Sequence, residues 1–126
     1  MPKTYTYQQR CPIARSLDIV GDRWTLLVIR DLGRGHSKFV DLMRELRGIA
    51  PNVLSDRLKL LEQEGLVAST LYSKHPPRAE YRLTEKGESL RPILQAFVEW
   101  GNEYAPRKPR GSTSNEAVDK VWPMAD

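Results

Sequence analysis

The chain has 126 residues, the length of one domain, and its 40% of hydrophobic and 29% of charged residues are close to globular averages. No apolar run approaches the roughly 20 residues of a membrane-spanning helix, and the segment from Met1 to Tyr5 lacks the apolar core of a signal peptide, which predicts a cytoplasmic protein. Twenty Lys and Arg against sixteen Asp and Glu give a net charge of +4, which permits a polyanionic partner without requiring one.

Basic side chains are concentrated in the middle of the chain. They outnumber acidic ones in 34–59 and again in 72–82, whereas acidic ones prevail in 85–103. The single cysteine cannot form an internal disulfide, which fits a reducing cytoplasm. One thiol and two histidines are too few for a dedicated zinc site, so we expect neither a metal nor a cofactor.

The first predicted elements are a polar arm in residues 1–10 and two helices. Pro12 favours a helix start directly after Cys11, and Gly21 ends this helix. Asp22 is the predicted N-cap of a second helix in 23–32, which is apolar over most of its surface and therefore predicted to be the central core helix.

Two further helices are predicted on either side of a short turn. Ser37 is expected to cap the third helix, whose apolar residues recur at helical spacing from Phe39 to Leu46. The turn at 47–49 contains a glycine, and the fourth helix runs from Pro51 to Glu64. Two helices joined in this way are typical of a helix-turn-helix.

A β-hairpin and a last helix complete the domain. The strands are predicted at 66–73 and 79–83, and the loop between them contains Pro76 and Pro77, which cannot donate to a ladder. Thr84 is expected to cap a helix that Pro92 kinks. The predicted fold class is mainly α with a small β-hairpin (α+β), a winged helix-turn-helix with N- and C-terminal dimerisation helices. This domain is predicted in 11–104, between the arm (1–10) and a polar tail (105–126).

The fourth helix has the pattern of a recognition helix. An α-helix fits the major groove of duplex DNA, where each base pair has its own donor and acceptor pattern. Leu54, Leu58 and Leu61 share one face of the helix, and the opposite face is polar. Arg57 flanks the apolar face but could reach a phosphate. Every amphipathic helix has a polar outside, so the helix alone leaves a solvated face as an equal alternative.

The hairpin tip favours DNA, because a basic tip beside such a helix suits the electronegative minor groove. The residues before the third helix add candidate phosphate contacts. The candidate DNA-binding residues are Ser37, Lys38, Pro51, Asn52, Ser55, Asp56, Arg57, Lys59, Lys74, His75 and Arg78.

An apolar stripe on the last helix predicts a homodimer. It can either cover the core or pack against a second copy, and the small core of such a domain favours dimerisation, with aromatic anchors. The candidate interface residues are Ile13, Leu17, Leu90, Ile93, Leu94, Phe97, Trp100 and Tyr104.

Cys11 is the candidate regulatory thiol. The amides of a helix N-terminus, with Arg10 and Arg15 nearby, favour a thiolate that oxidants and electrophiles modify. The alternative is a small, half-buried capping residue without a signalling role.

Several blocks of the sequence, taken together and in order, resemble the HxlR-type family of bacterial winged-helix transcriptional regulators. They span most of the chain and are Cys11–Arg15, Gly21–Leu27, Gly48-Ile49, Val53–Leu58, Glu64–Val67, Pro76–Arg78 with Glu80-Tyr81, and Leu83-Thr84 with Gly87.

The resemblance implies a cytoplasmic homodimer that binds double-stranded DNA at an operator with two-fold character and packs through its first and last helices. It implies recognition by the fourth helix and contact by the hairpin tip, and in some relatives the cysteine at this position senses oxidants, quinones or aldehydes. The chain departs from the family at Ala50, where Ser or Thr usually caps the recognition helix.

Three alternative functions differ in their support. An enzyme is disfavoured because the sequence has no phosphate-cradling glycine loop, and Asp18, Asp22 and Asp31 fall at predicted helix caps and surfaces. A winged helix can also serve protein–protein contact, since a fold does not fix a function. The third alternative keeps DNA binding but takes a small apolar ligand in the dimer cleft as its signal.

Overall fold

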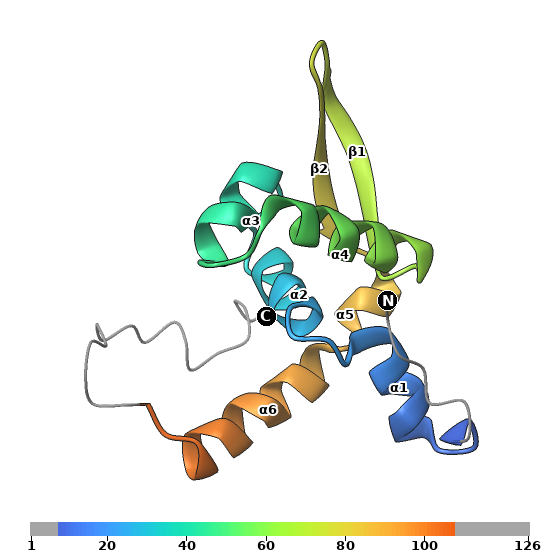
Figure 1. Ribbon diagram of the computed structural model, residues 1–126, viewed down its shortest axis with the longest axis vertical. Coiled ribbons are helices and arrows are strands. Elements are labelled where there is room, and N and C mark those ends of the chain that lie inside the picture. The colour runs from blue at the N-terminus through green and yellow to red at the C-terminus, as the bar shows by residue number, and fades with distance from the viewer. Residues whose placement is uncertain (1–7, 108–126) are drawn as a thin grey trace.

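A computed structural model describes residues 8–107 of the chain. The elements in this range are α1 (Pro12–Val20), α2 (Thr25–Gly33), α3 (Phe39–Glu45), α4 (Pro51–Gln63), β1 (Val67–Lys74), β2 (Pro77–Leu83), α5 (Glu85–Glu88) and α6 (Arg91–Tyr104) (Figure 1). The fold is mainly helical with one antiparallel hairpin, and this confirms the predicted fold class. Most of the predicted arm (1–7) and of the predicted tail (108–126) lies outside the described residues.

One apolar core holds α2, α3, α4 and the base of the hairpin together. Val28 and Ile29 of α2 are fully buried, as expected for the central helix. The leucines of α4 that share one helical face join the same core, which confirms the predicted orientation of that helix. The fully or almost fully buried members are Val28, Ile29, Leu42, Leu46, Leu54, Leu58, Leu61, Leu66 and Val67.

Asp22 binds amides at the start of α2 as expected of a capping residue, although the helix begins at Thr25 and its N-cap is Trp24, whereas the start of α3 has no side-chain cap. Asp22 accepts hydrogen bonds from the backbone amides of Trp24 (2.9 Å) and Thr25 (3.0 Å), which satisfies two donors at the helix N-terminus. Ser37 does not cap α3, because its hydroxyl lies 3.1 Å from a carboxylate oxygen of Glu80 and donates to it. The prediction for Ser37 was therefore wrong, since a carboxylate distant in sequence outcompetes the local amides.

The hairpin is longer than predicted and projects from the helical body (Figure 1). Its register runs from Val67 opposite Leu83 to Lys74 opposite Pro77, with an irregularity after Leu71. The expectation that Pro77 lies in the loop was wrong, because a proline is tolerated as the first residue of a strand. The strands therefore carry their pairing almost to the tip.

The predicted kinked helix is two separate helices, α5 and α6. Thr84 caps α5 as expected, accepting a hydrogen bond from the amide of Gly87 (3.2 Å). Pro92 lies in the first turn of α6, where its missing N–H breaks no helical hydrogen bond, so it starts a helix instead of bending one.

Asp31 is a buried residue of α2 and not the surface residue that the sequence suggested. Arg30 pairs with its carboxylate at 2.8 Å, and Arg34 lies 3.8 Å away. These two cations compensate the buried charge, which would otherwise be strongly unfavourable in the core.

Gly87 provides a test of the packing between α5 and the hairpin. A methyl group added there would lie 2.2 Å from the carbonyl oxygen of Leu66 and 3.0 Å from a methyl carbon of Leu83. We expect Gly87→Ala to lower the free energy of unfolding by about 2 kcal/mol or more, a fall of roughly 8 °C or more in Tm measured by circular dichroism. Gly101→Ala is the matched control, because nothing lies within 4 Å of the added methyl group in the chain. Equal Tm values for the two variants would contradict the packing described here.

Candidate nucleic-acid interface

The outer face of α4 is polar and accessible. Pro51, Asn52, Asp56 and Lys59 are exposed, and Ser55 is partly exposed. The three buried leucines on the opposite face fix the rotation of the helix, so these side chains point away from the core. Ala50 makes no side-chain cap, and Pro51 occupies the first turn, where its fixed φ favours the helix.

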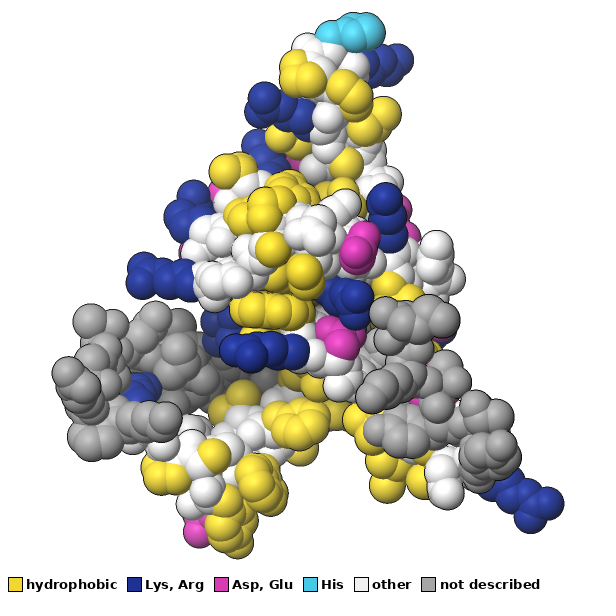
Figure 2. Space-filling view, in the orientation of Figure 1, with side chains coloured by type: hydrophobic (Ala, Val, Ile, Leu, Met, Phe, Trp, Pro, Cys, Tyr) yellow, Lys and Arg dark blue, Asp and Glu magenta, His cyan; other side chains and the backbone are white. Residues whose placement is uncertain are grey.

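The hairpin tip is the second part of the interface. Lys74, His75 and Arg78 are all exposed, and Figure 2 shows basic side chains and a histidine gathered at the tip. No hydrogen bond or ion pair within residues 8–107 occupies the charged groups of Lys74 and Arg78. The two paired strands carry this tip away from the helical body, and β1 packs against α4, so the free positive charge and the helix lie on the same side of the domain (Figure 1).

The segment before α3 is tied to the hairpin. The amide of Tyr81 donates to the carbonyl of Ser37 at 2.8 Å, and Lys38 forms an isolated bridge with Glu80. The ammonium nitrogen of Lys38 lies 4.8 Å from the centre of the Tyr72 ring, a distance typical of a cation–π contact. The structure thus joins Ser37 and Lys38 to β2, some forty residues further along the chain. Tyr72 and Glu80 could not be predicted as partners from the sequence, because no local pattern reveals such distant contacts.

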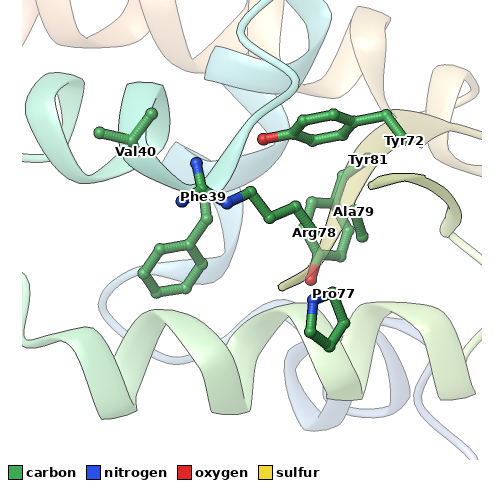
Figure 3. A pocket seen from close by; sticks show the side chains of 7 residues that line it. All are labelled: Phe39, Val40, Tyr72, Pro77, Arg78, Ala79 and Tyr81. Atoms are coloured by element: carbon green, nitrogen blue, oxygen red, sulfur yellow. The ribbon is translucent and has the colours of Figure 1, made fainter. Parts of the chain in front are cut away.

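A groove of about 400 Å³ lies between α3 and the hairpin (Figure 3). Arg78 extends across it towards Phe39 and Val40, so its guanidinium lies over an apolar surface. Burial, with Glu62 nearby, raises the pKa of Tyr81 above its ordinary value and keeps the phenol neutral. The lining residues are Phe39, Val40, Tyr72, Pro77, Arg78, Ala79 and Tyr81.

Arg57 does not belong to the exposed face of α4. Its guanidinium forms an ion pair with Asp22 at 3.1 Å, and its side chain is only 24% exposed. Burial alone would raise the pKa of Asp22. Hydrogen bonds from the Thr25 hydroxyl and from the amides of Trp24 and Thr25, together with the charge of Arg57, hold that pKa below its usual 3.8. The structure therefore gives Arg57 a partner within the protein, the carboxylate of Asp22.

The candidate dimer residues divide into two groups. Leu94 is buried in the core and Leu90, the N-cap of α6, packs against it, so these two predicted interface residues face the domain's own core. The side chains on the outer side of α6 and on α1 are exposed, and Figure 2 shows hydrophobic surface at this end of the molecule. The exposed members are Ile13, Leu17, Ile93, Phe97, Trp100 and Tyr104.

Cys11 lies at the N-terminus of α1 and is partly exposed. It makes no side-chain capping hydrogen bond to α1, and its amide donates to the carbonyl of Gln8 at 3.0 Å. Arg15 donates to the carbonyl of Gln9. The thiol is thus held at an accessible helix start.

Within residues 8–107, no three His, Cys, Asp or Glu side chains gather in a way that could hold a metal ion. The helices of the same range are too short or too polar to cross a bilayer.

A helix-turn-helix with a basic hairpin packed against its second helix is the architecture of winged-helix DNA-binding domains. The chain belongs to the HxlR-like helix-turn-helix family, whose profile matches residues 19–109. An uncharacterised HTH-type transcriptional regulator of Mycobacterium bovis is 44% identical over 95 residues, which are 75% of this chain and 60% of that protein. The chain therefore spans less than two thirds of the length of this relative. YdeP, an HTH-type transcriptional regulator of Bacillus subtilis, is 31% identical over 111 residues, 88% of this chain and 87% of its own.

Solved structures agree with this assignment. The transcription-factor candidate PA1607 superposes with a TM-score of 0.73 at 36% identity, covering 86% of this chain and 75% of its own. The redox regulator HypR in its reduced form superposes with a TM-score of 0.70 at 32% identity, covering 75% of this chain and 94% of its own. The reduced transcriptional regulator YodB of Bacillus subtilis superposes with a TM-score of 0.65 at 31% identity, covering 78% of this chain and 98% of its own. The chain thus shares its helix-turn-helix domain with proteins described as HTH-type transcriptional regulators.

Proposed function

We propose that this protein is a sequence-specific regulator that binds duplex DNA as a homodimer. The observation that carries the proposal is the polar outer face of α4 together with the unpaired cations at the tip of the hairpin that packs against this helix. In this arrangement α4 enters the major groove, where Asn52 and Ser55 reach base edges near its N-terminus. Lys74, His75 and Arg78 then lie against the minor groove or its phosphates.

The exposed apolar face of α1 and α6 supports the dimer. Phe97 is 56% exposed and Trp100 is 60% exposed, and Trp100 stacks at an angle on Tyr104 with ring centres 5.4 Å apart. Water contact with so many large apolar side chains is unfavourable, and a second copy would remove it. A two-fold axis through this face places two copies of α4 for successive major grooves, about 34 Å apart. The operator would share that symmetry.

A second candidate function is thiol sensing by Cys11. Its support is the partly exposed thiol at the start of α1, together with the likeness to HypR, which is a redox regulator. In this proposal an oxidant takes two electrons and two protons from two Cys11 thiols, one from each protomer, and leaves a disulfide between them. Because α1 belongs to the proposed dimer face, the disulfide would change how the two copies of α4 are spaced.

The two parts of the DNA surface should respond differently to mutation. We expect Lys74→Ala and Arg78→Ala to weaken binding to operator and random DNA alike, and to reduce the salt slope of log K by about 0.9 for each phosphate that the variant no longer neutralises. Asn52→Ala should instead relax preference at particular bases, at a cost of about 1–3 kcal/mol. Fluorescence anisotropy over a salt series measures both effects on a fragment footprinted upstream of the protein's own gene. Salt-independent binding without sequence preference would instead favour a protein partner.

A charged substitution on the exposed face of α6 tests the proposed dimer. We expect Trp100→Glu to convert the dimer to a monomer in light scattering, because a carboxylate cannot be buried there without a partner. Val40→Glu is the matched control, since Val40 is 65% exposed on α3 and outside the proposed interface. A monomeric wild-type protein at micromolar concentration would refute the proposed dimer.

Thiol sensing predicts that diamide lowers operator affinity of the wild-type protein at least about tenfold and leaves Cys11→Ser unaffected. Non-reducing gel electrophoresis should show a cross-linked dimer only for the wild type. If both proteins keep their affinity in diamide, Cys11 is a structural residue; if both respond to an added apolar compound, the signal is a ligand.

A further inference from the structure

The ion pair between Asp22 and Arg57 connects the recognition helix to the junction of α1 and α2. Arg57 lies in the middle of α4, and its Nη1 is 3.1 Å from Oδ2 of Asp22. The same carboxylate accepts hydrogen bonds from the amides of Trp24 and Thr25 and from the Thr25 hydroxyl. A single side chain therefore fixes the start of α2 and a point on α4 at once.

The junction is also constrained on the α1 side, where that helix ends. Gly21 ends α1, and its amide donates to the carbonyl of Leu17 at 2.8 Å. A methyl group at Gly21 would lie 2.4 Å from that oxygen, so the chain turns here with no space for a larger residue. Asp22 follows directly, which means that α1, α2 and α4 are linked through two consecutive residues.

Arg57 is poorly placed to leave Asp22 for a DNA phosphate. Its Nε is buried and has no hydrogen-bond partner, a cost that the ion pair offsets. If the guanidinium moved outward, the carboxylate of Asp22, with 30% of its side chain exposed, would lose its cation. Both side chains are thus more stable together than apart.

We propose that Asp22 and Arg57 are positioning residues for DNA recognition: their ion pair fixes the orientation of α4 relative to α1 and thereby aligns Asn52 and Ser55 with the bases. The inference rests on the proposed DNA-binding function of α4. Neither side chain touches DNA in this arrangement, and Arg57 contributes no phosphate contact.

Whether Asp22→Asn weakens or strengthens operator binding distinguishes a positioning role of the ion pair from a purely electrostatic effect on DNA. Asparagine keeps the oxygen that accepts from the two amides, so the cap of α2 remains, but it removes the charge that holds Arg57. If only electrostatics mattered, loss of a negative charge near a polyanion would strengthen DNA binding. Positioning predicts the opposite: Asp22→Asn weakens operator binding.

The experiment is a double-mutant cycle with Asp22→Asn and Arg57→Gln, measured as operator affinity over a salt series. We expect each variant to lose about tenfold in operator affinity with an unchanged salt slope, and the double variant to lose no more than either single one. Glu85→Gln, an exposed carboxylate on α5, is the control for removing one negative charge. The proposal is overturned if Arg57→Gln reduces the salt slope by about 0.9 and Asp22→Asn binds the operator more strongly. It is also overturned if the double variant loses as much operator affinity as the two single variants combined.

Amide NMR spectra of the free protein test the ion pair without DNA. Both single variants should shift the same signals, in the exposed face of α4 and around Trp24, while thermal unfolding shows that each variant is folded. If the two variants shift separate sets of signals, the ion pair does not position α4 and the inference fails. If both variants shift the same signals but the wild-type protein shows no sequence preference for DNA, it is the proposed function that fails.

Discussion

The burial of one face of α4 against α2 is the constraint on which the rest of the structure depends. Leu54, Leu58 and Leu61 are buried within the same core as Val28 and Ile29. A helix with one face fixed in a close-packed core can present only the opposite face to a partner. The polar face of α4 is therefore available to DNA because the apolar face is fully used.

The hairpin and the segment before α3 extend this rigid core towards the proposed DNA-binding side. The hairpin alone would be a marginal element, since isolated two-stranded hairpins are barely stable in water. Here its base is part of the core, through Val67, and its middle is held by the contacts of Ser37 and Lys38 with Tyr81 and Glu80. These contacts fix the direction of the tip, so its cations are pre-organised instead of spread over many conformations.

The other end of the molecule follows a different principle. Most large side chains of α6 are exposed, and Leu94 alone is buried within it. Leu94 and Val98, one turn apart, anchor the helix to the core, while its outer stripe stays exposed, as the proposed dimer requires. In a dimer of this kind the distance between the two recognition helices depends on α1, α6 and the contacts that link them to α4. The Asp22–Arg57 pair is one such contact.

Local patterns in the sequence were sufficient for the order and type of most elements. The spacing of Leu54, Leu58 and Leu61 predicts which face of α4 is buried, and Pro12, Gly21 and Asp22 mark helix ends by backbone chemistry that acts over a few residues. Only the tertiary structure decided that Arg57 faces Asp22, that Ser37 binds Glu80, and that Leu90 and Leu94 serve the domain's own core. Each of these outcomes depends on a partner from another element, and sequence periodicity fixes a side chain's direction on its own helix but not what lies opposite to it.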